Sequence, residues 1–77
     1  MRIGRVVATV VAPIKHAGLG GSKLLVVAFD DGTRTVAVDD LGAGEDSCVL
    51  VATGSHAVQV VRPDSPADDV IVGLLDD

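Results

Sequence analysis

Two histidines and one cysteine are the residues of this chain best suited to bind a transition metal. His16, Cys48 and His56 lie far apart in the sequence, whereas structural zinc sites usually take ligands from pairs only a few residues apart. Ser55 precedes His56, but adjacent side chains diverge and no nucleophile-elbow pattern surrounds them. We therefore expect no metal, no cofactor and no enzymatic activity.

Two glycine-rich stretches imitate nucleotide-binding loops. Residues 18–23 resemble a phosphate-binding loop, but that motif needs Gly, Lys and Ser in this order followed by a helix, and here Lys23 follows Ser22 and opens an apolar run. Residues 42–44 lack the third glycine of the dinucleotide fingerprint and precede another apolar run. Both stretches are predicted to be turns.

Charge and composition narrow the range of partners. Six Lys and Arg against eleven Asp and Glu give a net charge of −5, which disfavours nucleic acid. Phe29 is the single aromatic residue, so the chain has no platform on which bases or sugars could stack. No apolar run approaches the roughly 20 residues that span a bilayer, and no signal peptide is evident. We expect a cytosolic protein that contacts neither membrane nor nucleic acid.

The elements that must position these residues are short strands in one domain, residues 1–77. Five apolar runs of strand length are bounded by Gly, Pro or acidic residues, and they cover residues 3–12, 23–29, 33–39, 48–52 and 70–75. A short helix is predicted over residues 55–61, with Ser55 as its N-cap. The acidic pairs lack the ligand spacing of a calcium loop and are predicted to form turns or solvated surface.

The second and third runs are predicted to form a hairpin, because Asp31 and Gly32 connect them and glycine tolerates the positive φ of a tight turn. The third run alternates, which predicts one dry face. Arg34, Val36 and Val38 share one side of it, and the other side carries Ala37, Asp39 and two threonines.

Most other strands are apolar on both faces, although the chain is too short to cover a sheet with helices. A small closed barrel would bury one set of side chains and expose the other, which is either Val7, Val11, Leu25 and Val27 or their even-numbered neighbours. Association with further copies would bury this outer set. The fold class is therefore an all-β, five-stranded OB-like barrel with one short helix, assembled as a homo-oligomer.

A series of residues along the chain resembles the EutN/CcmL family, the pentameric vertex proteins of bacterial microcompartments. The most distinctive match is the run Ala37, Val38, Asp39, Leu41, Gly42, Ala43 and Gly44. Matching residues elsewhere are Gly4, Val6, Thr9 and Val10, then Lys15, Gly18, Leu19, Gly21, Lys23, Leu24, Leu25 and Val26, then Val49, Leu50, Val51, Gly54, Ser55, Ala57 and Gln59, and finally Pro66, Asp68, Val72 and Asp76.

The resemblance implies an OB-like protomer, a cyclic homopentamer and a structural role at the vertices of a polyhedral shell in the bacterial cytoplasm, with hexameric shell proteins as neighbours. The candidate residues at a subunit contact or near the five-fold axis are Asp39, Gly42, Ala43 and Gly44, and those of the family's loop motif are Lys15, Gly18, Gly21 and Lys23. The alternative for residues 42–44 is a turn that is remote from any subunit contact. An alternative function is a small OB-like module that binds a protein or metabolite. The residues alone fit a pentamer or a hexamer.

Overall fold

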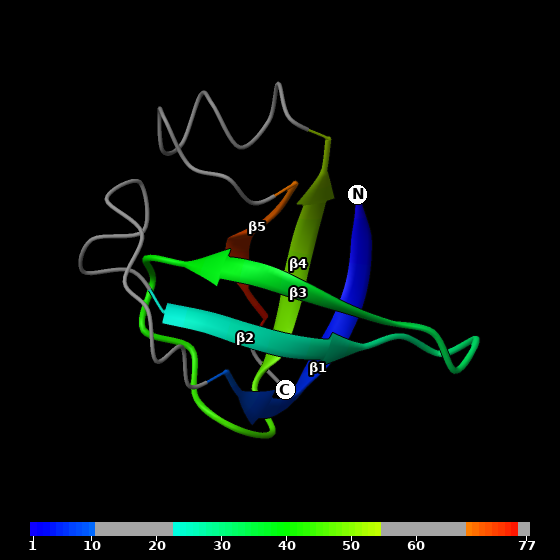
Figure 1. The fold of residues 1–77 in the computed structure, drawn as a ribbon, viewed down its shortest axis with the longest axis horizontal. Helices are drawn as coiled ribbons and strands as arrows, with labels where there is room; N and C mark the ends of the chain where they lie inside the picture. Colours follow the sequence, from blue (N-terminus) through cyan, green and yellow to red (C-terminus); the bar gives the residue numbers. More distant parts are fainter. Residues whose placement is uncertain (11–22, 55–67, 76–77) are drawn as a thin grey trace.

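The part of the chain that the structure describes forms five strands, all of which lie near the predicted positions. The computed structural model describes residues 1–10, 23–54 and 68–75. Its strands are β1 (Arg2–Thr9), β2 (Lys23–Ala28), β3 (Arg34–Asp39), β4 (Cys48–Thr53) and β5 (Asp69–Leu74) (Figure 1). The predicted helix over residues 55–61 and the loop residues Lys15, Gly18 and Gly21 lie outside the described residues.

The strands close into a barrel in the order β1-β2-β3-β5-β4, with β4 returning to β1. All neighbouring pairs are antiparallel except β3 and β5, which run parallel. This five-stranded closed barrel confirms the OB-like, all-β prediction. Because every strand has two hydrogen-bonded neighbours, the described barrel presents no open sheet edge.

The predicted hairpin joins β2 to β3 in an unbroken register from Lys23↔Asp39 to Ala28↔Arg34. Its loop is one residue longer than a two-residue turn. The Phe29 N–H donates to the Thr33 carbonyl oxygen at 2.9 Å, and the Gly32 N–H donates to the Phe29 carbonyl oxygen at 3.0 Å. Gly32 has φ of +85°, a conformation that glycine adopts without a Cβ penalty.

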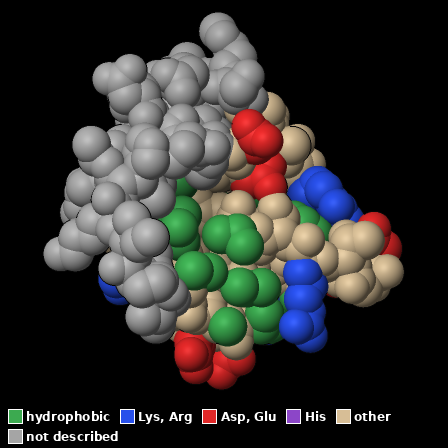
Figure 2. Space-filling model, in the orientation of Figure 1, with side chains coloured by type: hydrophobic (Ala, Val, Ile, Leu, Met, Phe, Trp, Pro, Cys, Tyr) green, Lys and Arg blue, Asp and Glu red, His purple; other side chains and the backbone are tan. Residues whose placement is uncertain are grey.

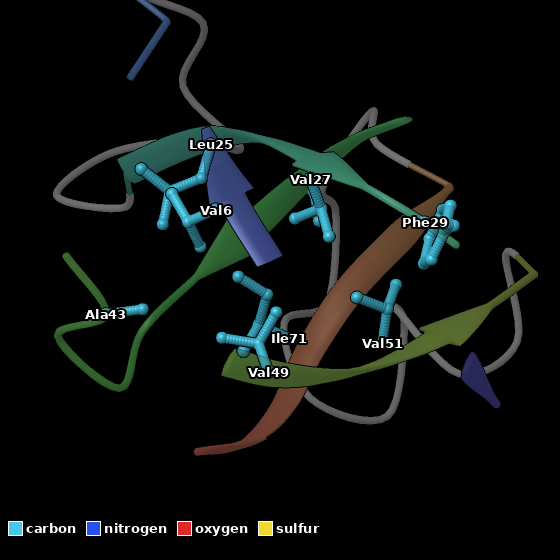
Figure 3. Packing of buried hydrophobic residues seen from close by; sticks show 9 residues of the cluster. Val6, Leu25, Val27, Phe29, Ala43, Val49, Val51 and Ile71 are labelled. Atoms are coloured by element: carbon cyan, nitrogen blue, oxygen red, sulfur yellow. The ribbon is translucent and has the colours of Figure 1, made fainter. Parts of the chain in front are cut away.

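Aliphatic side chains fill the barrel interior (Figure 3). The interior cluster consists of Val6, Leu25, Val27, Phe29, Ala37, Ala43, Val49, Val51 and Ile71. Most of its members are β-branched, which suits both strand propensity and the confined volume between facing strands. The interior cluster thus contains one aromatic residue, Phe29, and its other members are aliphatic.

The alternation of β3 did not reveal which of its faces is buried. Ala37 is fully buried, whereas Val36 is 45% exposed. The cause is the register with β2, where Leu25 lies opposite Ala37 and directly opposed residues share a face of the sheet. Of the two alternative outer sets, the structure selects the even-numbered neighbours on β2, because Leu25 and Val27 are buried, whereas on β1 the odd-numbered Val7 is exposed. Val11 lies outside the described residues.

A second, smaller apolar cluster lies outside the interior cluster, on β3, β4 and β5. Val38, Ala52 and Val70 form it, and Leu24 and Val72 pack against it partly buried. Strands β3, β4 and β5 are therefore buried on both faces in this region. The absence of polar alternation predicts this for β4 and β5. The alternation of β3 predicts one dry face, and the structure differs by burying Val38 on the other face as well.

Strand β1 pairs with both of its neighbours by changing partner along its length. Its first half pairs with β4, from Arg2↔Val51 to Arg5↔Cys48, and its second half pairs with β2. The register with β2 shifts between Val6 and Ala8, which is the signature of a β-bulge. Bulges increase local twist, so this one lets β1 close the barrel.

Candidate functional site

Asp39 is buried at the end of β3 and holds the turn that follows it. Its side chain is 2% exposed. The Leu41 N–H donates to Asp39 Oδ1 at 2.9 Å, and the Ala43 N–H donates to Oδ2 at 2.8 Å. Both carboxylate oxygens therefore accept backbone hydrogen bonds, which compensates the burial of a charged group.

The glycines of this turn have different tasks. Gly42 has φ of +84°, in the left-handed region that favours glycine. The Gly44 N–H donates to Ser47 Oγ at 3.0 Å, and the Ser47 N–H donates to the Gly44 carbonyl oxygen at 3.1 Å. Ala43 is 2% exposed and belongs to the interior cluster. Its side chain therefore packs the turn against the barrel interior.

Backbone hydrogen bonds tie the end of the turn to β1. The Val6 N–H donates to the Ser47 carbonyl oxygen at 3.0 Å, and the Asp46 N–H donates to the Val6 carbonyl oxygen at 2.9 Å. Arg5 Nη1 donates to the Asp46 carbonyl oxygen at 2.6 Å. Ser47 and Asp46 were not among the predicted site residues. The available signal was that Gly44, Asp46 and Ser47 are all of types common in turns.

The structure therefore divides the four candidate contact residues into two groups. Asp39 and Ala43 are buried within the protomer, whereas Gly42 and Gly44 lie on its surface. Lys23 is exposed at the start of β2 and lies opposite Asp39 in the register, which places it beside this turn.

Phe29 is covered and therefore offers no aromatic surface. Its side chain is 9% exposed, and the Arg2 guanidinium carbon lies 3.8 Å from its ring centroid. Arg2 also pairs with Asp31 at 3.0 Å. Two hydrogen bonds from Thr33 are the main cause that lowers the pKa of Asp31 below its ordinary value of 3.8, and the Arg2 charge adds to the effect. These contacts fasten the start of β1 to the hairpin loop.

Polar and ionisable side chains do not converge on a reactive centre in the described part of the chain. Within residues 1–10, 23–54 and 68–75, no three His, Cys, Asp or Glu side chains are placed to hold a metal ion. The Thr35 hydroxyl donates to Asp69, and the other Asp69 oxygen has no partner in these ranges. The described residues also contain no helix of the length and apolarity needed to cross a membrane.

The outer surface of the barrel is instead rich in exposed aliphatic side chains. Figure 2 shows hydrophobic side chains gathered over β2 and its neighbours β1 and β3, with Lys and Arg side chains beside them. Among residues 1–10, 23–54 and 68–75, the exposed large hydrophobic residues are Met1, Ile3, Val7, Val36, Leu41, Leu74 and Leu75. Apolar surface gathered in this way marks a site of association.

Comparison with known proteins gives this surface a context. The family model described as "Ethanolamine utilisation protein EutN/carboxysome" matches residues 1–76. The chain is 42% identical to the bacterial microcompartment shell vertex protein GrpN of Rhodospirillum rubrum, over 99% of this chain and 93% of the relative. It is 39% identical to the carboxysome shell vertex protein CcmL of Thermosynechococcus vestitus, over 99% of this chain and 84% of the relative.

Solved structures agree with the sequence comparison. An ethanolamine utilisation protein, EutN, superposes with a TM-score of 0.89 at 34% identity, over all of this chain and 88% of that one. The pentameric microcompartment shell protein GrpN from Rhodospirillum rubrum superposes with a TM-score of 0.84 at 41% identity, over all of this chain and 95% of that one. The relatives are thus structural shell vertex proteins, and this chain belongs to the EutN/carboxysome family.

Proposed function

We propose that this protein forms a homopentamer that closes the vertices of a bacterial microcompartment shell, and that it acts as a structural component rather than as an enzyme. The observation that carries the proposal is the family match over residues 1–76. In addition, relatives that are named shell vertex proteins match this chain over 84–93% of their own length. The shell encloses a compartment inside the bacterial cytoplasm, so this is where the protein would act.

The proposed role is geometric. A flat layer of six-fold tiles closes into a polyhedron only where five-fold units are inserted, so hexameric shell proteins would be the lateral neighbours of the pentamer. A small, rigid protomer suits this task, and the described chain is a closed barrel whose strands are all paired. Its exposed aliphatic side chains supply surface that association would bury.

The turn after β3 remains our candidate for a subunit contact or a position near the five-fold axis. Gly42 and Gly44 would supply this contact, because they are exposed and carry no side chain that would hold a neighbour away. Asp39 and Ala43 would act indirectly, by fixing the shape of the turn from within the protomer.

The alternative, an OB-like module that binds a soluble ligand, lacks a supporting observation. Binding of bases or sugars on this fold relies on exposed aromatic side chains. Phe29 is the single aromatic residue of the sequence, and it is buried beneath Arg2.

Native mass spectrometry of the purified protein tests the proposal directly. We expect a species of five times the monomer mass. Co-expression with a hexameric shell protein should then give closed polyhedral shells by electron microscopy, whereas omission of this chain should leave shells open at their vertices. A protein that stays monomeric at high concentration, or shells that close equally well without it, would contradict the proposal.

A further inference from the structure

We propose that two separate apolar surfaces of the barrel form the subunit contact, with one surface of each protomer packed against the other surface of the next. The inference rests on the proposed pentamer, and it adds which residues make that pentamer. We call the two surfaces the β2 surface (Val7, Ala8, Val26 and Val36) and the β4 surface (Ile3, Cys48, Leu50 and Leu75).

The β2 surface is centred on Val26. Val26 lies opposite Ala8 on β1 and opposite Val36 on β3, so the three side chains form one outward row across three strands. Val36 is 45% exposed and the bulge residue Val7 is 40% exposed, while Ala8 and Val26 are half-buried. The row crosses β1, β2 and β3, the strands over which hydrophobic side chains gather in Figure 2.

The β4 surface is centred on Leu50. Leu50 lies opposite Ile3 on β1 and opposite Gly73 on β5, which has no side chain to cover it. Ile3 is 59% exposed. Leu75 is 39% exposed and lies next to Cys48, since its N–H donates to the Cys48 carbonyl oxygen at 2.9 Å.

The two surfaces are distinct because Arg5 separates them along β1. Arg5 is exposed and lies between Ile3 and Val7 in the strand. Around the barrel, β2 and β4 are separated by β1 in one direction and by β3 and β5 in the other. The surfaces therefore neither coincide nor lie diametrically opposite each other.

This arrangement matches the symmetry of a ring. A cyclic assembly of more than two copies uses a head-to-tail contact, in which two different patches of each subunit meet, whereas a two-fold dimer uses one patch twice. Patches on opposite sides would favour an open fibre, and patches inclined to each other allow closure. The described strands leave no open edge, so side chains rather than added strands would make a contact on this part of the barrel.

Single charged substitutions test each surface separately. We expect Val36→Asp on the β2 surface and Ile3→Asp on the β4 surface each to abolish the pentamer at a concentration where the wild-type protein is fully pentameric. Asp30→Lys is the matched control, because Asp30 is exposed in the hairpin loop outside both surfaces, and this variant should stay pentameric. Circular dichroism should show that every variant keeps its strands, because Val36 and Ile3 are exposed in the protomer.

Mixing the two disruptive variants tests the head-to-tail pairing itself. Val36→Asp chains keep an intact β4 surface and Ile3→Asp chains keep an intact β2 surface, so the mixture contains one compatible contact. We expect native mass spectrometry to show a heterodimer of one copy of each variant and no larger ring. Val7→Asp with Leu75→Asp forms a second pair, to be used if either variant of the first pair loses its fold.

Different failures have different meanings. If the wild-type protein is pentameric but both single variants remain pentameric, the surface assignment is wrong and the proposed function stands. If either variant alone forms homodimers, or if the mixture stays monomeric, the head-to-tail pairing of these two surfaces is overturned. If the wild-type protein itself does not form a pentamer, the proposed function fails.

Discussion

Replacing Gly4 with alanine tests how closely β1 approaches β2 in the barrel. Gly4 is buried in β1. A Cβ added at this position would overlap Val27 Cγ1 and would lie 3.0 Å from both the Ala28 carbonyl oxygen and Phe29 Cδ1. Two of these neighbours belong to the packed interior cluster and the third is backbone, so none can move away freely.

The expected loss of stability follows from this crowding. Forcing one methyl group into a well-packed core commonly costs about 1–3 kcal/mol. For a domain of this size, that range corresponds to a fall in melting temperature of about 4–24 °C. We expect Gly4→Ala in the upper half of the range, because the Ala28 carbonyl oxygen is held in the sheet.

Gly73→Ala is the matched control for this measurement. Gly73 also lies in a strand and has no positive φ, but a Cβ added there would lie 3.6 Å from Leu50 Cβ, an ordinary contact distance. We expect this variant within about 0.5 kcal/mol of the wild-type protein. Both variants should be unfolded in urea at equal protein concentration, with native mass spectrometry reporting their assembly, because association contributes to apparent stability.

Equal stabilities of the two variants would refute the reasoning. That result would mean that Gly4 lies farther from the Val27 and Phe29 side chains than the structure shows, so that an added Cβ has room.

Three further predictions concern the turn after β3 and the hairpin loop. Asp39→Ala should destabilise the protomer by about 1–3 kcal/mol in urea unfolding, because the Leu41 and Ala43 N–H groups lose their acceptors, and Asp39→Asn should cost less because it keeps one acceptor oxygen. Ala43→Glu should prevent folding, measured by circular dichroism, because it places a charge in the interior cluster, whereas Gly44→Glu should keep the fold and lose the pentamer if the turn lies at a subunit contact. Since the folded pKa of Asp31 is lowered, its carboxylate stabilises the folded state above pH 3.8, and this contribution disappears as the pH falls through the folded pKa. The difference in urea midpoint between wild type and Asp31→Asn should therefore be constant near neutral pH and shrink below pH 3.8; a difference that persists in acid would contradict this.

The sequence was sufficient to predict the strands and their fold class, because apolar runs between turn residues are a local signal. The antiparallel pairing of β2 and β3 followed from the Asp31 and Gly32 turn alone. The loop is one residue longer than the Asp31 and Gly32 pair, because the hydrogen bonds between Phe29 and Thr33 close it and Asp30 lies within the turn.

The assignment of faces could not be predicted, since it depends on long-range register. Val36 and Ala37 are both apolar, and the pairing with Leu25 on β2 decides that Ala37 is buried. Similarly, the acidic character of Asp39 indicated surface, and the two backbone donors that allow its burial come from a turn conformation that composition does not reveal. The crowding at Gly4 comes from Val27, Ala28 and Phe29, which lie 23 to 25 positions later in the chain, and no local pattern encodes it.

The position of β5 in the barrel has a consequence for the newly made chain. Strand β5 follows the other four in the sequence, yet it lies between β3 and β4 and supplies the partner that each of them lacks. Until the ribosome releases β5, two valine-containing strands have unpaired backbone groups and invite pairing with other nascent chains. Translation therefore leaves the chain prone to aggregate until β5 emerges from the ribosome, and a premature stop before Asp69 would make that state permanent.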